Sequence, residues 1–143
     1  MKYNKTILHP AWVTGFIDGE GCFYCGIKPN SNMILSFQVT LVFSISQHIR
    51  DILLMKKLID FFNCGYINKV GSTQCQYRIS NINDLEQYLF PLLNHYTLKT
   101  KKFLDAEAFI KIHKLILTKK HLTIEGLNQI KSIKATMNRA RMQ

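Results

Sequence analysis

The run from Ile34 to Gln47 alternates between apolar and polar side chains, and this pattern restricts the fold more than any other feature of the chain. Its apolar members are Phe37, Val39, Leu41, Phe43 and Ile45, and its polar members are Gln38, Thr40, Ser44 and Ser46, with Val42 as the apolar exception. Successive side chains of a strand point to opposite faces, so the pattern predicts a half-buried antiparallel strand. Such a strand needs partner strands beside it and a layer that covers its apolar face.

Sequence patterns before and after this run predict both the partner strands and the covering helices. Pro10 predicts a helix start, with the helix continuing over 11–18 until Gly19 and Gly21 stop it. Strands are predicted at 22–28, 66–70 and 74–80, with turns at 29–32 and 71–72. A helix is predicted over 48–62, ending at Asn63 and Gly65. Its apolar residues at helical spacing are Ile49, Ile52, Leu53 and Ile59.

The C-terminal part predicts helices only. Asn83 and Glu86 have the spacing of a capping box, and Pro91 should kink the helix that they open. A longer helix fits 101–117, and Thr123 is the expected cap of a last helix that runs to about Arg139. The apolar stripe expected on the longer helix is Phe103, Ala106, Ile110, His113 and Leu117. The expected fold class is therefore α+β, with one domain over 1–143 and a four-stranded antiparallel sheet under helices.

Charge narrows the partners. The chain has 19 basic and 9 acidic residues among 143, a net charge of +10, which favours DNA, RNA or an acidic membrane surface. No apolar run is long enough to cross a membrane, and the first residues have no apolar signal region. We therefore expect a nucleic-acid partner and no membrane.

The cysteines point to a reducing compartment. Cys22 and Cys25 form a CxxC pattern, but they lie in a predicted strand, where residues three apart point to opposite faces. Cys64 and Cys75 do not form a second such pair. We therefore favour buried free thiols over a metal site or a disulfide.

The second face of the predicted sheet is polar and free of acids. Amide and basic side chains can bind base edges, and a twisted ribbon that carries them can lie in a major groove. From the pattern alone, simple solvation of this face is an equal alternative. The residues concerned are Lys28, Gln38, Thr40, Ser44, Asn68, Gln76 and Arg78.

One segment decides between these alternatives. Residues 13–21, VTGFIDGEG, resemble the LAGLIDADG motif position by position: Gly15, Ile17, Asp18 and Gly21 are the family's own letters, and Glu20 replaces the second acid. Further blocks resemble the family in the right order, namely 43–47 with 48–51, 64–67, 98–102, 121–127 and 137–139. The chain is thus identified as similar to single-motif LAGLIDADG homing endonucleases.

This resemblance implies a saddle-shaped sheet in αββαββα order and a homodimer. It also implies cleavage of both strands of a long, pseudo-palindromic double-stranded DNA site by metal-dependent phosphodiester hydrolysis, which promotes intron homing. The expected cofactor is Mg²⁺ or Mn²⁺, with Ca²⁺ supporting binding without cleavage. The expected location is an organelle, mitochondrion or chloroplast.

The resemblance also assigns residues. Glu20 and the carbonyl of Gly19 would bind metal, whereas Asp18 would be structural. Gln47 and a lysine of the basic segment, Lys101 first and Lys102 as the alternative, would act at the periphery of catalysis. The residues expected to contact DNA are Tyr24, Lys28, Asn30, Asn32, Gln38, Thr40, Ser44, Asn68, Ser72, Gln74, Gln76 and Arg78. The residues expected at the dimer interface are Ala11, Trp12, Thr14, Gly15, Asp18 and Gly19; the two glycines lie four apart and share a helix face.

Three alternatives remain open at this point. Some relatives assist splicing as RNA maturases, and others bind DNA without cutting it. The chain could also be one half of a two-motif or engineered protein. A surface that would bind host intron RNA contains Lys111, Lys114, Lys119, Lys120, Lys131 and Lys134.

Overall fold

The computed structural model describes residues 7–138. The elements are α1 (Pro10–Glu20), β1 (Gly21–Pro29), β2 (Phe37–His48), the 3-10 turn η1 (Ile49–Asp51), α2 (Ile52–Phe62), β3 (Tyr66–Val70), β4 (Gln74–Ile79), α3 (Ile82–Asp84), the π-helical turn η2 (Leu85–Leu89), α4 (Phe90–His95), α5 (Lys102–Leu117), the 3-10 turn η3 (Lys120–Leu122) and α6 (Ile124–Lys134). This order confirms the predicted α+β class.

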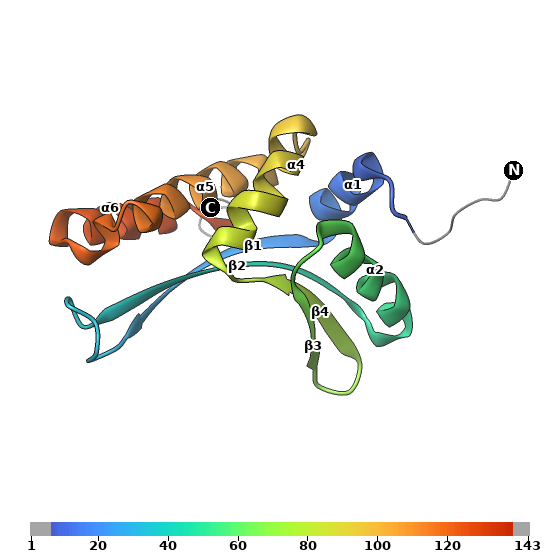
Figure 1. The fold of residues 1–143 in the computed structure, drawn as a ribbon, viewed down its shortest axis with the longest axis horizontal. Coiled ribbons are helices and arrows are strands. Elements are labelled where there is room, and N and C mark those ends of the chain that lie inside the picture. Colours follow the sequence, from blue (N-terminus) through green and yellow to red (C-terminus); the bar gives the residue numbers. More distant parts are fainter. Residues whose placement is uncertain (1–6, 139–143) are drawn as a thin grey trace, which may run out of the picture.

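The strands form one antiparallel sheet in the order β1-β2-β4-β3. β2 is the long central strand: Gly21 pairs with its Ile45, and Arg78 of β4 pairs with its Ser44. The helices lie above one face of this curved sheet, and the underside of the arch is free (Figure 1). The fold therefore gives the sheet one covered and one open face.

The covered face holds the core. Phe23, Phe43, Tyr77 and Phe109 are all fully buried, and Phe23 lies against both Phe43 and Phe109, at ring-centroid distances of 5.3 and 5.4 Å. Burying side chains of this size contributes most of the driving force for folding. In β2 the predicted alternation is confirmed at Leu41, Phe43 and Ile45, which face this core.

The start of β2 differs from the prediction. Residues 34–36 belong to the turn, and the strand begins at Phe37. The Asn30 N–H donates to Ser36 O at 2.8 Å, and Ser36 adopts a φ of 61°. This left-handed conformation keeps Ser36 out of the strand, a boundary that the alternation of side chains did not indicate.

Two predicted helical faces are wrong in part. In α2, Leu53 is 72% exposed, and the buried residues are Met55, Leu58 and Phe62. The 3-10 turn before the helix shifts its phase relative to a helix that starts at 48.

In α5, Phe103 and Leu117 are 38% and 45% exposed, whereas Ala106 and His113 are buried as predicted. Ile110 is only partly buried. The rest of the buried face comes from Asp105, Ala108, Phe109, Ile112 and Leu115, because α5 packs against both the sheet and α6.

Helix ends also differ from the prediction. Asn81, rather than Asn83, caps α3: its side chain accepts from the Asn83 and Asp84 N–H groups. The π-helical turn η2 stands immediately before α4, whose second residue, Pro91, cannot donate a backbone hydrogen bond. α1 continues through Gly19 to Glu20 and passes into β1 without a loop.

Thr123 caps α6 as predicted: its side-chain oxygen accepts a hydrogen bond from the Gly126 N–H. However, α6 ends at Lys134, so Met137 and Asn138 lie beyond it. Arg139 lies outside the described residues.

The cysteines lie as the strand argument predicts. Cys22 is exposed and Cys25 is buried, and burial raises the pKa of the Cys25 thiol to about 11. All four cysteines are free thiols, although only Cys25 and Cys75 are buried. Over residues 7–138, no helix is long and apolar enough to cross a membrane.

Candidate nucleic-acid interface and acidic site

Glu20 is the last residue of α1 and is exposed at the junction with β1. The next residue, Gly21, is fixed by packing: a Cβ there would lie 2.8 Å from both the carbonyl oxygen and Cγ2 of Ile17. The junction therefore stays tight, and the chain turns directly from the helix into the sheet. Among residues 7–138, no hydrogen bond or ion pair engages the exposed Glu20 side chain.

Asp18, two residues earlier, forms hydrogen bonds within the chain. Its carboxylate accepts from the N–H groups of Lys99 and Thr100, at 2.8 and 3.0 Å, and from the Thr100 hydroxyl at 2.8 Å. Burial acts to raise the pKa of Asp18, but these hydrogen bonds and the charge of Lys102 outweigh it, so the pKa lies below its ordinary value. Asp18 therefore ties the end of α1 to the segment that leads into α5.

The two lysines of the basic segment differ. The Lys102 ammonium donates to the carbonyls of Ile17 and Asp18, at 3.3 and 3.1 Å, and so caps the C-terminal end of α1. Lys101 is exposed, just before α5 begins. The structure thus brings Lys102, the second choice from the sequence, to the motif, and leaves Lys101 outside these contacts.

Gln47 also lies at this end of the sheet. Gly21 pairs with Ile45, so Gln47 is two residues beyond the last β1–β2 pair, on the edge where α1 joins β1. It pairs with Cys75 of β4 and is half-buried. Glu20 and Lys102 therefore lie at the end of α1, and Gln47 lies at the adjacent end of the sheet.

The open face of the sheet carries most of the predicted DNA contacts. From β1, β2, β3 and β4 these are Tyr24, Lys28, Gln38, Thr40, Ser44, Asn68, Gln74, Gln76 and Arg78. Asn30, Asn32 and Ser72 lie in the two hairpin loops instead. The register also places Ser46, His48 and Tyr66 on this face. The alternation of β2 and β3 in the sequence already indicated that these three residues face the same way, but they were not among the predicted DNA contacts.

Electrostatics favour a polyanion on this face. It carries Lys28 and Arg78 and no carboxylate, because none of its strand positions is Asp or Glu. Among residues 7–138, the Nε of Arg78 is buried without a hydrogen-bond partner.

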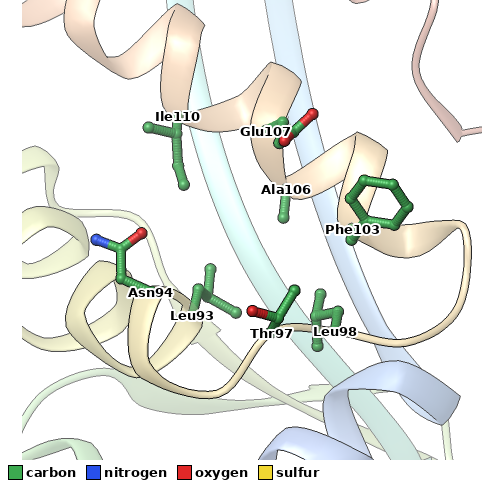
Figure 2. A pocket seen from close by; sticks show the side chains of 8 residues that line it. All are labelled: Leu93, Asn94, Thr97, Leu98, Phe103, Ala106, Glu107 and Ile110. Atoms are coloured by element: carbon green, nitrogen blue, oxygen red, sulfur yellow. The ribbon is translucent and has the colours of Figure 1, made fainter.

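The pocket between α4 and α5 lies apart from the predicted site. This pocket, of about 200 Å³, is lined by Leu93, Asn94, Thr97, Leu98, Phe103, Ala106, Glu107 and Ile110 (Figure 2). It contains none of the predicted site residues, and Glu107 is its only charged side chain. The acidic end of α1 beside a curved, carboxylate-free sheet instead defines a class of proteins built to bind an extended polyanion.

Comparison with known proteins identifies that class. The profile of the LAGLIDADG endonuclease family matches residues 13–113. The chain belongs to this family.

Two relatives show the range of the similarity. The probable intron-encoded endonuclease 2 of Neurospora crassa is 38% identical over 127 residues, which is 88% of this chain and 26% of that protein. The DNA endonuclease I-CreI of Chlamydomonas reinhardtii is 34% identical over 101 residues, 71% of this chain and 60% of that protein. The chain thus spans only about a quarter of such fungal relatives.

Solved structures agree with the fold. The meganuclease I-SmaMI bound to cleaved DNA superposes with a TM-score of 0.93 at 36% identity, covering 99% of this chain and 47% of that one. I-LtrWI bound to target DNA gives a TM-score of 0.92 at 36% identity, covering 98% and 47%. The chain therefore corresponds to about half of each of these DNA-bound proteins.

Proposed function

We propose that this protein is a site-specific DNA endonuclease that hydrolyses both strands of a long, pseudo-palindromic duplex and so promotes homing of its host intron. The observation that carries the proposal is the free carboxylate of Glu20 at the edge of an open sheet face that has no acid of its own. Relatives named as intron-encoded endonucleases support it. Its setting would be an organellar genome.

A divalent metal fits this end of α1. Lys102 occupies the carbonyls of Ile17 and Asp18, so the next carbonyl, that of Gly19, lies free of this cap beside Glu20. Mg²⁺ and Mn²⁺ prefer such oxygen ligands and take the remainder from phosphate and water. Within residues 7–138, no three His, Cys, Asp or Glu side chains form a metal-binding group. I-SmaMI was crystallised with its uncleaved target in the presence of calcium ions.

Bound there, the metal would activate water and stabilise the leaving oxygen of an in-line displacement. Glu20 would hold it by charge, and Gly19 by its carbonyl. Lys102 fixes the helix end that carries this pair, and its ammonium would add positive charge beside a bound phosphate. Gln47, at the adjacent strand end, would orient the attacking water.

A second copy would place two such sites side by side. A Cβ added at Gly15 or Gly19 would meet no heavy atom within 4 Å, so packing within the chain does not require either glycine. A glycine inside a helix costs about 1 kcal/mol relative to alanine. We therefore propose that close approach of another α1 retains them, in a twofold homodimer. Ala11 and Trp12 are exposed on the same helix, whereas Thr14 is buried and donates to Pro10 O.

The test uses the whole chain, Mg²⁺ and a randomised duplex library, with sequencing of the cut ends. We expect cuts in both strands at one palindrome-like site. Glu20→Gln should abolish cutting, yet specific binding in Ca²⁺ should persist, because the amide keeps the shape and loses the charge. Normal cutting by Glu20→Gln, or an absence of any preferred site in the wild type, would refute the proposal.

One observation favours a second activity, the binding of intron RNA by the helical side. Three of the predicted lysines, Lys111, Lys114 and Lys120, line a common pocket of about 210 Å³ between α5 and α6. Lys131 lies elsewhere, 5.0 Å above the ring of Phe37. Replacing Lys111 and Lys114 together by Glu should weaken binding of a labelled structured transcript and leave duplex cleavage intact. Unchanged RNA affinity would count against this activity.

A further inference from the structure

The start of β1 is tied by one side chain to the segment that follows α6. The Asn138 Nδ2 donates to the Phe23 carbonyl at 2.9 Å, across 115 positions of the sequence. β1 is an edge of the sheet, so alternate carbonyls of this strand point away from β2 and need a donor from elsewhere. Phe23 lies three residues after Glu20, the exposed acid of the proposed metal site. The Asn138 side chain therefore holds the strand close to that acid.

Asn138 is itself bound to α5. Its backbone N–H donates to the Oδ1 of Asp105 at 3.0 Å, and only 8% of Asp105 is exposed. A buried carboxylate is costly unless hydrogen bonds compensate it, and the Asn138 N–H offsets part of that cost. Asn138 has a φ of 56°, in the left-handed region that asparagine adopts more readily than most residues. With this conformation, one residue donates to α5 through its N–H and to β1 through its side chain.

The same turn of α5 also holds the chain before Glu20. Lys102 and Asp105 lie three residues apart, so they share a face of this helix. The Lys102 Nζ donates to two carbonyls of α1 that precede Glu20. Glu20 therefore lies between two attachments to the first turn of α5. Lys102 makes the one before it, and Asp105 makes the one after it through Asn138.

We propose that Asn138 is a positioning residue for the acidic site: it ties the backbone after Glu20 to α5 and so holds the carboxylate where it can bind a divalent metal. Among residues 7–138, no hydrogen bond or ion pair engages the Glu20 side chain, so its backbone attachments set its position. Groups that orient a metal ligand without touching the metal change metal affinity or activity by about 10–100-fold when they are removed. The inference rests on the proposed function, because it assumes that Glu20 binds metal.

Asn138→Gly tests this link. Glycine adopts the left-handed conformation without strain and keeps the N–H that Asp105 accepts, so the exchange removes only the donor to Phe23. In the metal-free protein, hydrogen–deuterium exchange measured by mass spectrometry should become faster in the peptide that covers the junction of α1 and β1. With the preferred duplex in excess, the Mg²⁺ concentration for half-maximal cleavage should rise by about tenfold. The duplex affinity in saturating Ca²⁺ should stay unchanged, because no residue of the open face is altered.

Asn81→Gly is the matched control, because the same exchange removes a side chain that accepts two backbone hydrogen bonds at the start of α3. It should change neither the deuterium exchange of the junction nor the Mg²⁺ requirement. Asn138→Asp, which loses the same donor but keeps the shape, should shift both quantities in the same direction as Asn138→Gly. Deuterium exchange in the remaining peptides shows that each variant is folded.

Three results would overturn the inference and leave the proposed function intact. The first is unchanged deuterium exchange at the junction in Asn138→Gly, and the second is an unchanged Mg²⁺ requirement in that variant. The third is an equal shift in Asn81→Gly, since it would trace the effect to the stability of the whole fold. A wild type that cuts no duplex would instead refute the proposed function, and the inference with it.

Discussion

Replacing Asp18 by asparagine should destabilise the fold without removing a ligand of the proposed metal site. The carboxylate accepts two backbone N–H groups and one hydroxyl from Lys99 and Thr100. An asparagine has a single oxygen, so in either orientation its NH₂ faces one of those N–H donors. Hydrogen bonds to a charged group are worth about 1.5–3 kcal/mol when shielded from water. Because Asp18 is only half-buried, we expect a loss of about 1–2 kcal/mol, equivalent to a fall in Tm of about 3–8 °C.

The lowered pKa of Asp18 also predicts how the loss of stability in D18N changes with pH. The pKa of Asp18 is lowered in the folded protein, so folding favours the ionised carboxylate. Its contribution is complete above the ordinary carboxyl pKa, and it is lost as the pH falls through the lowered folded value. The difference in Tm between wild type and D18N should therefore be full at neutral pH and begin to close below about pH 4.

Differential scanning calorimetry at one protein concentration, from neutral to acidic pH, measures both effects. E20Q is the matched control, because Glu20 is a neighbouring exposed acid and a surface change of this kind stays within about 0.5 kcal/mol. An unchanged Tm for D18N at neutral pH would refute the reasoning, as would a difference that widens in acid.

Three further predictions test other contacts. Gly15→Leu should leave the monomer folded and shift sedimentation from dimer to monomer, since a Cβ at this position would meet no heavy atom of the chain within 4 Å; a persistent dimer would contradict the proposed interface. Gly126→Ala should lower the free energy of unfolding by about 1–3 kcal/mol in urea titrations, because its Cβ would overlap the Lys120 carbonyl, and an unaffected midpoint would contradict that packing. A thiol reagent at mildly alkaline pH should modify Cys22 faster than Cys25: burial raises the pKa of both thiols, that of Cys25 to about 11, but Cys22 is exposed to the reagent. Specific duplex should then protect Cys22, and equal rates at both would contradict the strand register.

Some elements could be predicted because local rules and tertiary packing agree in them. The alternation of β2 identified its buried face, and Asn63 and Gly65 ended α2 as expected, both with positive φ. The motif located the acidic end of α1 because its glycines and acids all lie within one helix, so their spacing in the sequence fixes their positions along it.

Other details depend on neighbours that a sequence pattern does not contain. The buried face of α5 is broad because the sheet and α6 both cover it, so a narrow stripe that included Phe103 was wrong. The sequence could not tell which of Lys101 and Lys102 contacts α1, since either lysine can face α1 until the start of α5 is known. The contact of Lys102 with α1 joins residues about 85 positions apart.

Asp18 and Glu20, the two acids at the end of α1, have different roles, and this difference has an evolutionary consequence. Asp18 is bound into the fold by three hydrogen bonds, whereas Glu20 is exposed. A substitution at 18 would weaken the fold, but one at 20 would leave it stable. Under the proposed function, a lineage that no longer benefits from cutting can therefore lose that activity at Glu20 in one step and keep its fold.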